Sequence, residues 1–422
     1  MQRRVFLGAV SGATLVAGCD APARLAALPD KLRGNASFRD LPPNGRVVLD
    51  GKDDALLANI GLDALRRELA EQQRTGRPLG AADYLAISGG GENGAFGAGL
   101  LTGWTGLGTR PEFKAVTGVS TGALSAPFAF LGPDYDRDLE RFYTTISKQD
   151  VMASRGLLSG VLGESLYDST PLLRLIRGVL SESFVAAIAR EYGRGRLLFV
   201  CTTNLDVPVG VLWNIGAIAA MGGSDASEMI ARILLASASI PGAFPPVMID
   251  LDADGVRYQE MHVDGGTVAQ IVLYPPSLGL DSLPGASTAE LTRLRRLVAT
   301  RKRRIYAIRN SRPGADIETV DRSTLKIAGR AVSTLISTQG IGDLYRLYVV
   351  AQRDGIDFNV AWIPDRFAEK PSEPFERGYM NRLFQVGREE MIAGKAWHKY
   401  PPGYDPTPLT NLGASAFAGS GG

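Results

Sequence analysis

The stretch that most constrains the fold is YLAISGGGENGAFGAGL, at residues 84–100. An apolar run, predicted as a strand over 83–88, gives way to Gly89, Gly90 and Gly91 and then to the small-residue pattern of a helix. A glycine-rich bend between strand and helix either holds a phosphate or presents bare backbone N–H groups to an oxyanion. The bend therefore predicts a ligand-facing turn in an α/β fold, and the surrounding sequence decides between the two uses.

A second bend of the same kind follows. The run KAVTGVS over 114–120 predicts another buried strand, and TGALSAPFAFLG over 121–132 has the apolar, small-residue character of a helix. Between them stands Gly118-Val119-Ser120-Thr121-Gly122, the G-x-S-x-G pattern of a nucleophile elbow. The glycines at 118 and 122 permit a tight turn without Cβ clashes, and the turn would present the Ser120 hydroxyl at a helix N-terminus.

The elbow bears on how the first bend is used. Gly89-x-Gly91-x-x-Gly94 formally matches the dinucleotide-binding fingerprint. That fold needs Asp or Glu at the end of the second strand to hold the ribose, whereas here the second strand ends in Ser120 and Glu112 precedes it. We therefore expect the N–H groups of Gly89, Gly90 and Gly91 to form an oxyanion hole beside Ser120, with dinucleotide binding as the weaker alternative.

Strand-like and helix-like patterns alternate along the rest of the chain. Short apolar, β-branched runs bounded by turn residues are separated by longer stretches with helical periodicity, which predicts an α/β fold with a mostly parallel sheet buried on both faces. No repeat or linker interrupts 46–400, so we expect one domain there. Strands are expected at 83–88, 114–120, 196–204, 211–216, 258–264, 304–310 and 357–364, and helices at 55–73, 91–104, 121–132, 227–240, 289–304 and 323–353.

A nucleophilic serine needs a base, and the chain has only two histidines, His262 and His398. His398 lies near the C-terminus and is expected at the surface. His262 and Asp264 share one face of a strand, but Asp264 stands at its carboxyl end, where α/β sites form, and His262 is expected one pleat deeper. Asp264, followed by Gly265-Gly266, is therefore the predicted partner of Ser120, and His262 remains the alternative base.

Taken in order, the three glycine-bearing motifs resemble the patatin-like phospholipase family. They are the triple glycine with Gly94, the elbow around Ser120, and Asp264-Gly265-Gly266, and they extend from residue 89 to residue 266. The resemblance implies a three-layer α/β/α fold and a Ser120–Asp264 dyad that hydrolyses acyl esters of lipids. Many members carry Arg or Lys just before the glycine that corresponds to Gly94, whereas this chain has Asn93, so the resemblance implies a lipid ester more firmly than a phospholipid.

These features predict a serine acyl hydrolase that cleaves lipid carboxyl esters, like a phospholipase A or lysophospholipase, through an acyl-serine intermediate. Two alternatives stay open: an acyltransferase on the same dyad, and a lipid-binding envelope protein without turnover. Lys and Arg total 46 against 44 Asp and Glu, so no charge excess predicts a nucleic-acid partner. Two Cys and two His argue against a metal site, and no cofactor is expected. The oligomeric state is left open.

The N-terminus carries targeting signals rather than fold. Val16-Ala17-Gly18-Cys19 resembles a bacterial lipobox, and Arg3-Arg4-Val5-Phe6-Leu7 resembles a twin-arginine export signal. We expect residues 1–18 to be a signal peptide, Cys19 to be lipidated and 19–45 to be a tether; an ordinary signal peptide with an incidental Cys is the alternative. The chain would then be a bacterial lipoprotein of the cell envelope, on the periplasmic side of the inner or outer membrane. Residues 401–422 are expected to form a flexible tail.

Overall fold

The structure is a computed structural model that describes residues 23–38, 41–155, 164–273, 288–314, 317 and 319–407. The predicted signal peptide (1–18), Cys19 and the last residues of the predicted tail (408–422) lie outside the described residues. The described helices include none with the length and apolar character needed to cross a bilayer.

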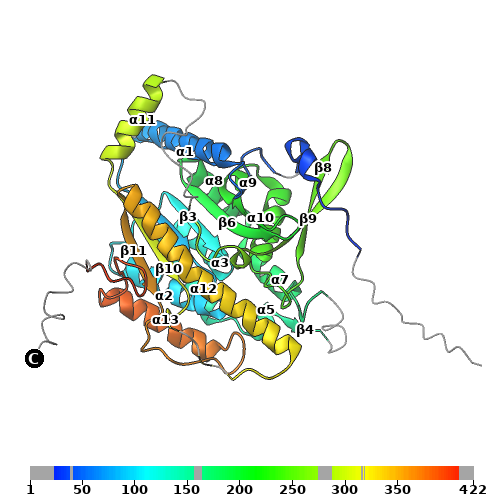
Figure 1. Cartoon of the computed structure of the whole chain (residues 1–422). Coiled ribbons are helices and arrows are strands. Elements are labelled where there is room, and N and C mark those ends of the chain that lie inside the picture. Colours follow the sequence, from blue (N-terminus) through cyan, green and yellow to red (C-terminus); the bar gives the residue numbers. More distant parts are fainter. Residues whose placement is uncertain are drawn as a thin grey trace, which may run out of the picture.

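Within the described residues, nine strands form one mixed sheet in the order β1-β7-β6-β3-β2-β10-β11, with β9 paired to β6 and β8 paired to β9 (Figure 1). Five neighbours, β6, β3, β2, β10 and β11, run parallel, and the pairs β1–β7, β6–β7, β6–β9 and β8–β9 are antiparallel. The strands are β1 (Arg46–Val48), β2 (Ala82–Ile87), β3 (Ala115–Val119), β6 (Leu197–Asn204), β7 (Val209–Asn214), β8 (Val247–Ala253), β9 (Val256–Asp264), β10 (Arg303–Arg309) and β11 (Asp357–Trp362), beside a separate pair, β4 (Ala153–Ser154) and β5 (Tyr167–Asp168).

Helices cover both faces of this sheet. Residues of α1 and α12 pack on one face, and residues of α2, α3, α8, α10 and α13 pack on the other. The α-helices are α1 (Asp54–Thr75), α2 (Gly94–Gly106), α3 (Thr121–Leu131), α4 (Asp136–Thr144), α5 (Lys148–Val151), α7 (Thr170–Val179), α8 (Glu182–Gly193), α9 (Ile215–Ala219), α10 (Gly223–Ser237), α11 (Thr288–Thr300), α12 (Thr324–Arg353) and α13 (Arg377–Ile392). Short 3-10 turns are η1 (Asp30–Asn35), η2 (Gly91–Asn93), η3 (Pro133–Tyr135) and η4 (Gly265–Thr267).

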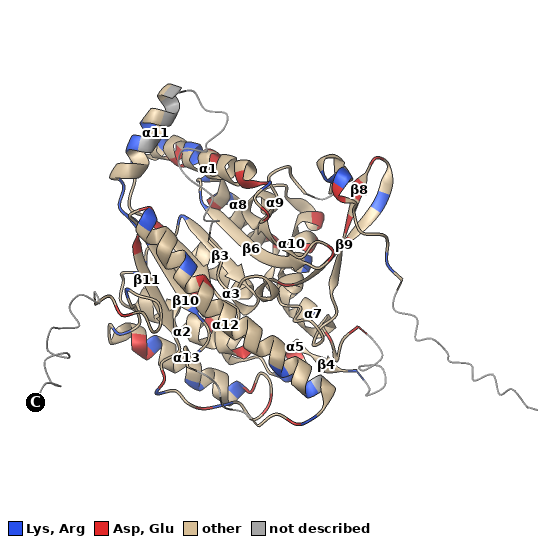
Figure 2. Ribbon diagram, in the orientation of Figure 1, with Lys and Arg blue, Asp and Glu red and all other residues tan. Residues whose placement is uncertain are grey.

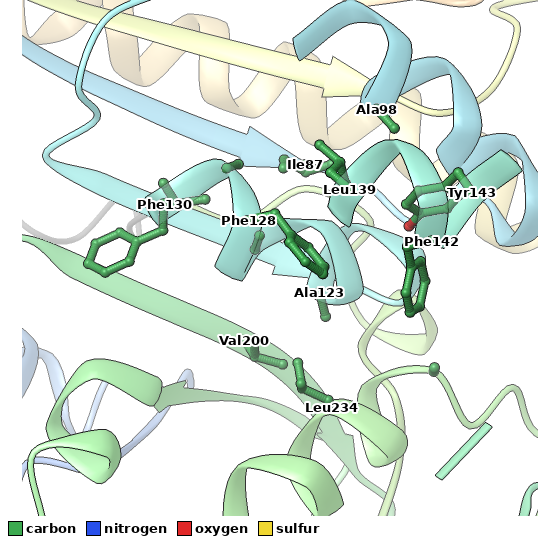
Figure 3. Close-up of a cluster of buried hydrophobic side chains, with 14 of the residues drawn as sticks. Ile87, Ala98, Ala123, Phe128, Phe130, Leu139, Phe142, Tyr143, Val200 and Leu234 are labelled. Carbon is green, nitrogen blue, oxygen red and sulfur yellow. The ribbon is translucent and has the colours of Figure 1, made fainter. Parts of the chain in front are cut away.

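Burial on both faces explains why the central strands read as continuous apolar runs. On β6, Leu198 and Val200 point into the larger core, while Phe199 and Cys201 point into the core beneath α1. Figure 3 shows the larger core around α3, where Phe128 and other aromatic rings pack over the sheet. The predicted three-layer α/β/α fold with a mostly parallel central sheet is therefore confirmed.

The described part of the predicted tether lies against the β8–β9 hairpin. The Arg24 guanidinium forms an ion pair with Asp206 at 2.7 Å, and the N–H of Gln259 donates to the Ala26 carbonyl at 3.1 Å. Ser37 forms a bridge with Asp252 on β8. These contacts make residues 23–38 part of the folded body.

The described start of the predicted tail also packs on the body. Tyr404 contacts Tyr348 of α12 with ring centroids 5.2 Å apart, and it stacks on Tyr400. Residues 401–407 thus rest on α12.

Candidate active site

Ser120 occupies the turn between β3 and α3 in a strained conformation. Its φ of 55° lies in the left-handed region, which a residue with a Cβ rarely adopts. A Cβ at Gly118 would lie 2.6 Å from the Cα of Ala123, and a Cβ at Gly122 would lie 2.6 Å from the carbonyl oxygen of Ser88. The two glycines are therefore required by the close approach of β2, β3 and α3, as the elbow pattern predicts.

The surroundings hold this turn in place. The backbone N–H of Ser120 donates to the Ser237 hydroxyl at 3.0 Å, and that hydroxyl donates to the Cys201 carbonyl at 2.7 Å. Ser237 ends α10 and Cys201 lies on β6, so the elbow is tied to two further elements. The side chain of Ser120 stands at the N-terminus of α3, where the helix dipole favours negative charge on its oxygen.

Asp264 lies at the end of β9, beside the elbow. Asp264 pairs with Thr202 on β6, and the preceding residue of β6, Cys201, pairs with Val119 of β3. Asp264 therefore lies next to the end of β3, where Ser120 follows. The N–H of Gly266 donates to the Asp264 carboxylate at 2.7 Å, and interaction with the Ser120 side chain lowers the pKa of the same carboxylate. The structure thus brings together the predicted nucleophile and the predicted base, from elements 144 residues apart (264 − 120).

Burial controls the proton affinity of Asp264. The side chain is 3% exposed, and desolvation raises the pKa of its carboxyl from 3.8 to about 6, although the hydrogen bonds from Ser120 and Gly266 act in the opposite direction. No Lys or Arg side chain contributes to this shift. A carboxylate with a pKa of about 6 is ionised at neutral pH and is a stronger base than an ordinary aspartate.

The triple glycine lies against the elbow. A Cβ at Gly89 would come within 3.1 Å of the Cβ of Ser120, which is tighter than an ordinary van der Waals contact, so the backbone of Gly89 lies directly against the elbow. Gly90 and Gly91 have φ angles of 154° and 57°. No described residue accepts a hydrogen bond from the N–H groups of Gly89, Gly90 or Gly91. These N–H groups are thus available to an oxyanion next to Ser120.

Asn310, directly after β10, braces the glycine loop, and the sequence patterns did not reveal it. Its side-chain amide donates to the Ser88 carbonyl at 3.0 Å, and its side-chain oxygen accepts from the Gly97 N–H at 3.1 Å. The Asn310 N–H donates to the Ser88 hydroxyl at 2.9 Å. A Cβ at Gly90 would lie 2.8 Å from the Cβ of Asn310. These contacts fix the loop from both ends.

Gln270 is a second site residue that sequence reasoning missed. A Cβ at Gly89 would lie 2.7 Å from its side-chain oxygen, and a Cβ at Gly266 would collide with its side-chain nitrogen. The Gln270 amide group therefore lies between the glycine loop and the turn that follows Asp264. Its backbone N–H donates to the buried Asp343 carboxylate at 2.7 Å, which links it to α12. A lone Gln in the sequence VAQIV carries no pattern that could have identified it.

Asn93, in the loop after the triple glycine, contacts α13. Its side-chain oxygen accepts from the Tyr379 hydroxyl of α13 at 2.7 Å. The position where many patatin-like proteins carry a positive charge is thus occupied here by a neutral side chain that joins the loop to α13.

The structure places neither histidine at the hydroxyl of Ser120. His262 is fully buried between Thr202, at 2.9 Å from Nδ1, and Glu260, at 3.0 Å from Nε2, and desolvation lowers its pKa. His398 is exposed and stacks on Trp362. The prediction that His262 lies one pleat deeper in the sheet than Asp264 is wrong, because β9 runs antiparallel to β6. Asp264 pairs with Thr202, whereas His262 pairs with Asn204, the last residue of β6, and so lies nearer the carboxyl end of that strand.

In the described part of the chain, no group of three or more His, Cys, Asp or Glu side chains is arranged to hold a metal ion. A hydroxyl beside a dry carboxylate, and beside N–H groups that no described residue accepts from, has the parts needed for nucleophilic attack on a carbonyl carbon.

No curated protein matches the sequence. Among solved structures, the chain is similar to VipD from Legionella pneumophila, with 10% identity, a TM-score of 0.36 and coverage of 75% of this chain and 67% of VipD. It is also similar to human GIVD cytosolic phospholipase A2, with 10% identity, a TM-score of 0.34 and coverage of 86% of this chain and 64% of that protein, which is less than two thirds of its length.

A family model gives the assignment. It is described as patatin-like phospholipase and matches residues 85–275, the segment that contains the glycine loop, the Ser120 elbow and Asp264. This match supports lipid ester hydrolase activity. Residues 85–275 of the chain are thus similar to the patatin-like phospholipase family.

Proposed function

We propose that the chain is a serine acyl hydrolase that cleaves carboxyl esters of lipids through a Ser120–Asp264 dyad. The observation that carries the proposal is the strained elbow serine beside a buried carboxylate whose pKa is raised to about 6 and which the Ser120 side chain affects directly. Such a pair needs no histidine, because the carboxylate itself can accept the hydroxyl proton.

The proposed reaction has two steps. In the first, the Ser120 oxygen attacks the ester carbonyl carbon while Asp264 accepts its proton, and the N–H groups of Gly89 to Gly91 stabilise the negative oxygen. The protonated Asp264 then gives the proton to the departing alcohol, which leaves an acyl group on Ser120. In the second step, water attacks the acyl-serine, Asp264 takes the water proton, and the fatty acid leaves as Ser120 recovers its hydrogen.

Labelling and turnover test the proposal together. Wild-type protein should react with a fluorophosphonate probe and hydrolyse p-nitrophenyl esters and phospholipid substrates. Ser120→Ala should abolish labelling and lower hydrolysis by at least about a thousandfold, and Asp264→Asn should lower hydrolysis to a similar extent. Ser183→Ala, at an exposed serine of α8, should behave as wild type. Unchanged hydrolysis in Ser120→Ala would overturn the proposal, and product analysis with an added alcohol would identify acyl transfer.

We also propose that the chain is anchored to the cell envelope through an acylated Cys19. The support is the sequence Val16-Ala17-Gly18-Cys19 after an apolar run with a basic start. Incorporation of labelled palmitate in a bacterial host, lost in Cys19→Ser, tests this proposal; equal labelling of both proteins would refute it.

A further inference from the structure

Helix α12 is longer than the sheet it covers. Its 30 residues extend about 45 Å, whereas the seven residues of β10 extend about 23 Å. The end of α12 lies at the start of β10, since the Arg303 guanidinium donates to the Asp354 carbonyl. The first part of α12 must therefore project beyond the edge at which β10 ends. In Figure 1 the yellow first turns reach well past the labelled strands β10 and β11.

The helix crosses this edge beside the candidate active site. Arg309, at the end of β10, donates to the Ser337 carbonyl at 3.3 Å. A Cβ at Gly340 would lie 3.3 Å from the Cβ of Gln270, and Asp343 accepts from the Gln270 N–H. Gln270 in turn lies against Gly89 and the turn after Asp264. The projecting half of α12, residues 324–336, thus ends beside the site at residue 336, and its earlier residues extend outward from the site.

The projecting half exposes an apolar stripe. Ile327, Ala331 and Leu335 follow one another at intervals of four residues, so they share one side of the helix. Ile327 is 54% exposed and Leu335 is 69% exposed. Gly340, which faces the protein, lies on the other side of the helix. An apolar stripe that turns away from the body of a protein is typical of a surface that contacts a partner.

The charge of this segment is positive. Arg322, Lys326 and Arg330 lie between residues 322 and 342, and this range contains no Asp or Glu. Figure 2 shows blue residues along the first turns of α12. An amphipathic helix with Lys and Arg on its polar side fits the interface of an anionic bilayer, where apolar side chains enter the acyl region and basic side chains meet the headgroups.

We propose that residues 324–336 of α12 dock on the surface of an anionic lipid bilayer and so bring the Ser120–Asp264 site close to the membrane. This inference rests on the proposed function, because a lipid ester must leave the bilayer to reach Ser120. The docking element lies where that transfer would occur, and it would act independently of an acyl chain on Cys19.

Vesicle sedimentation tests the proposal with matched variants of the full-length chain. All proteins carry Cys19→Ser, so that no acyl chain contributes. Leu335→Gln is compared with Val349→Gln, because Val349 lies on the same side of α12 and is 63% exposed, but stands 14 residues farther along (349 − 335) at the other end of the helix. On phosphatidylglycerol–phosphatidylcholine vesicles, Leu335→Gln should weaken partitioning by about tenfold, Ile327→Gln/Leu335→Gln should weaken it further, and Val349→Gln should leave it unchanged. Partitioning of the reference protein should fall in high salt and on pure phosphatidylcholine.

Hydrolysis of a short soluble ester separates docking from catalysis. The α12 variants should hydrolyse it at the reference rate while losing activity on vesicle lipid. Equal partitioning of all proteins, or an equal loss in Val349→Gln, would overturn the proposal. A dimer that Ile327→Gln/Leu335→Gln converts to a monomer would also overturn it, since the stripe would then join two copies of the chain. Loss of vesicle binding in the stripe variants, with no hydrolysis of any ester by the reference protein, would support docking and refute the proposed function.

Discussion

Replacing Asp264 by Asn is expected to stabilise the folded chain at neutral pH while it removes activity. Burial raises the pKa of this carboxyl to about 6 in the folded chain, and hydrogen bonds from Ser120 and Gly266 only partly oppose the shift. At neutral pH the folded chain must therefore hold an ionised carboxylate in a position that favours the neutral form. An Asn at this position carries no charge, and its side-chain oxygen can still accept from the Gly266 N–H.

The size of the effect follows from the shift. The pKa rises from 3.8 to about 6, roughly two units, and each unit corresponds to about 1.4 kcal/mol, so the ionised group costs about 3 kcal/mol of folding free energy. Because the folded-state pKa is raised, this stability is fully present below pH 3.8 and is lost as the pH rises through about 6. For 422 residues, 3 kcal/mol corresponds to a shift of about 3–4 °C in the unfolding midpoint.

Urea unfolding of both proteins across a range of pH measures this cost. The stability of Asp264→Asn minus that of the wild type should increase by about 2 kcal/mol between about pH 4.5 and pH 8 and then level off. The pH-independent consequences of the substitution cancel in this increase. Asp134→Asn, at an exposed carboxylate of η3, should show no such increase. A difference that stays flat or decreases with pH would refute the argument that Asp264 is held dry, and with it the physical reason for treating it as the base.

Three other outcomes are expected. Gly122→Ala should lower the midpoint of thermal unfolding by the equivalent of about 3 kcal/mol or prevent folding, because its Cβ would collide with main-chain carbonyls of β2 and of the loop after it. The control Gly61→Ala, in open space on α1, should leave the midpoint unchanged or raise it, and equal midpoints for the two variants would contradict the packing argument. Asn310→Ala should lower kcat on a soluble ester by about tenfold to a hundredfold with little change in KM, because the side chain braces the glycine loop without touching substrate; a change in KM alone would assign it to binding. The pH profile of kcat/KM should fall below about pH 6 with the titration of Asp264, and this limb should persist in His262→Gln; its disappearance there would make the histidine the base.

Local patterns were sufficient to predict the elements that frame the site. The strands before Gly89 and before Ser120 are apolar on both faces and end in glycine-rich turns, so their positions could be predicted from short windows of sequence. The elbow could be predicted because its strained turn demands glycine at both flanking positions. The position of Asp264 at the end of an apolar strand, directly before two glycines, was enough to select it as the candidate partner.

The direction of β9 could not be predicted in the same way. An apolar strand that ends in Asp-Gly-Gly has the same sequence pattern whether it runs parallel or antiparallel to its neighbour. The direction of β9 depends on its pairing with β6, whose residues lie about 60 positions away in the sequence. Gln270 and Asn310 were missed for a related reason. Each acts through contacts with main-chain atoms of distant segments, and such contacts impose no periodicity or spacing on the sequence around them.

The free energy of desolvating the ionised Asp264 carboxylate affects both the stability of the fold and the strength of the proposed base. His262 is held by Thr202 and Glu260, so in the proposed reaction proton transfer from Ser120 depends on the Asp264 carboxylate. An aspartate with a pKa of 3.8 would accept that proton about a hundredfold less readily than one with a pKa of about 6. The desolvation that improves the base is the same desolvation that lowers the stability of the folded chain above pH 6. A serine–aspartate dyad therefore requires a locally unfavourable carboxylate, and a substitution that admits water to Asp264 should strengthen the fold and weaken the enzyme together.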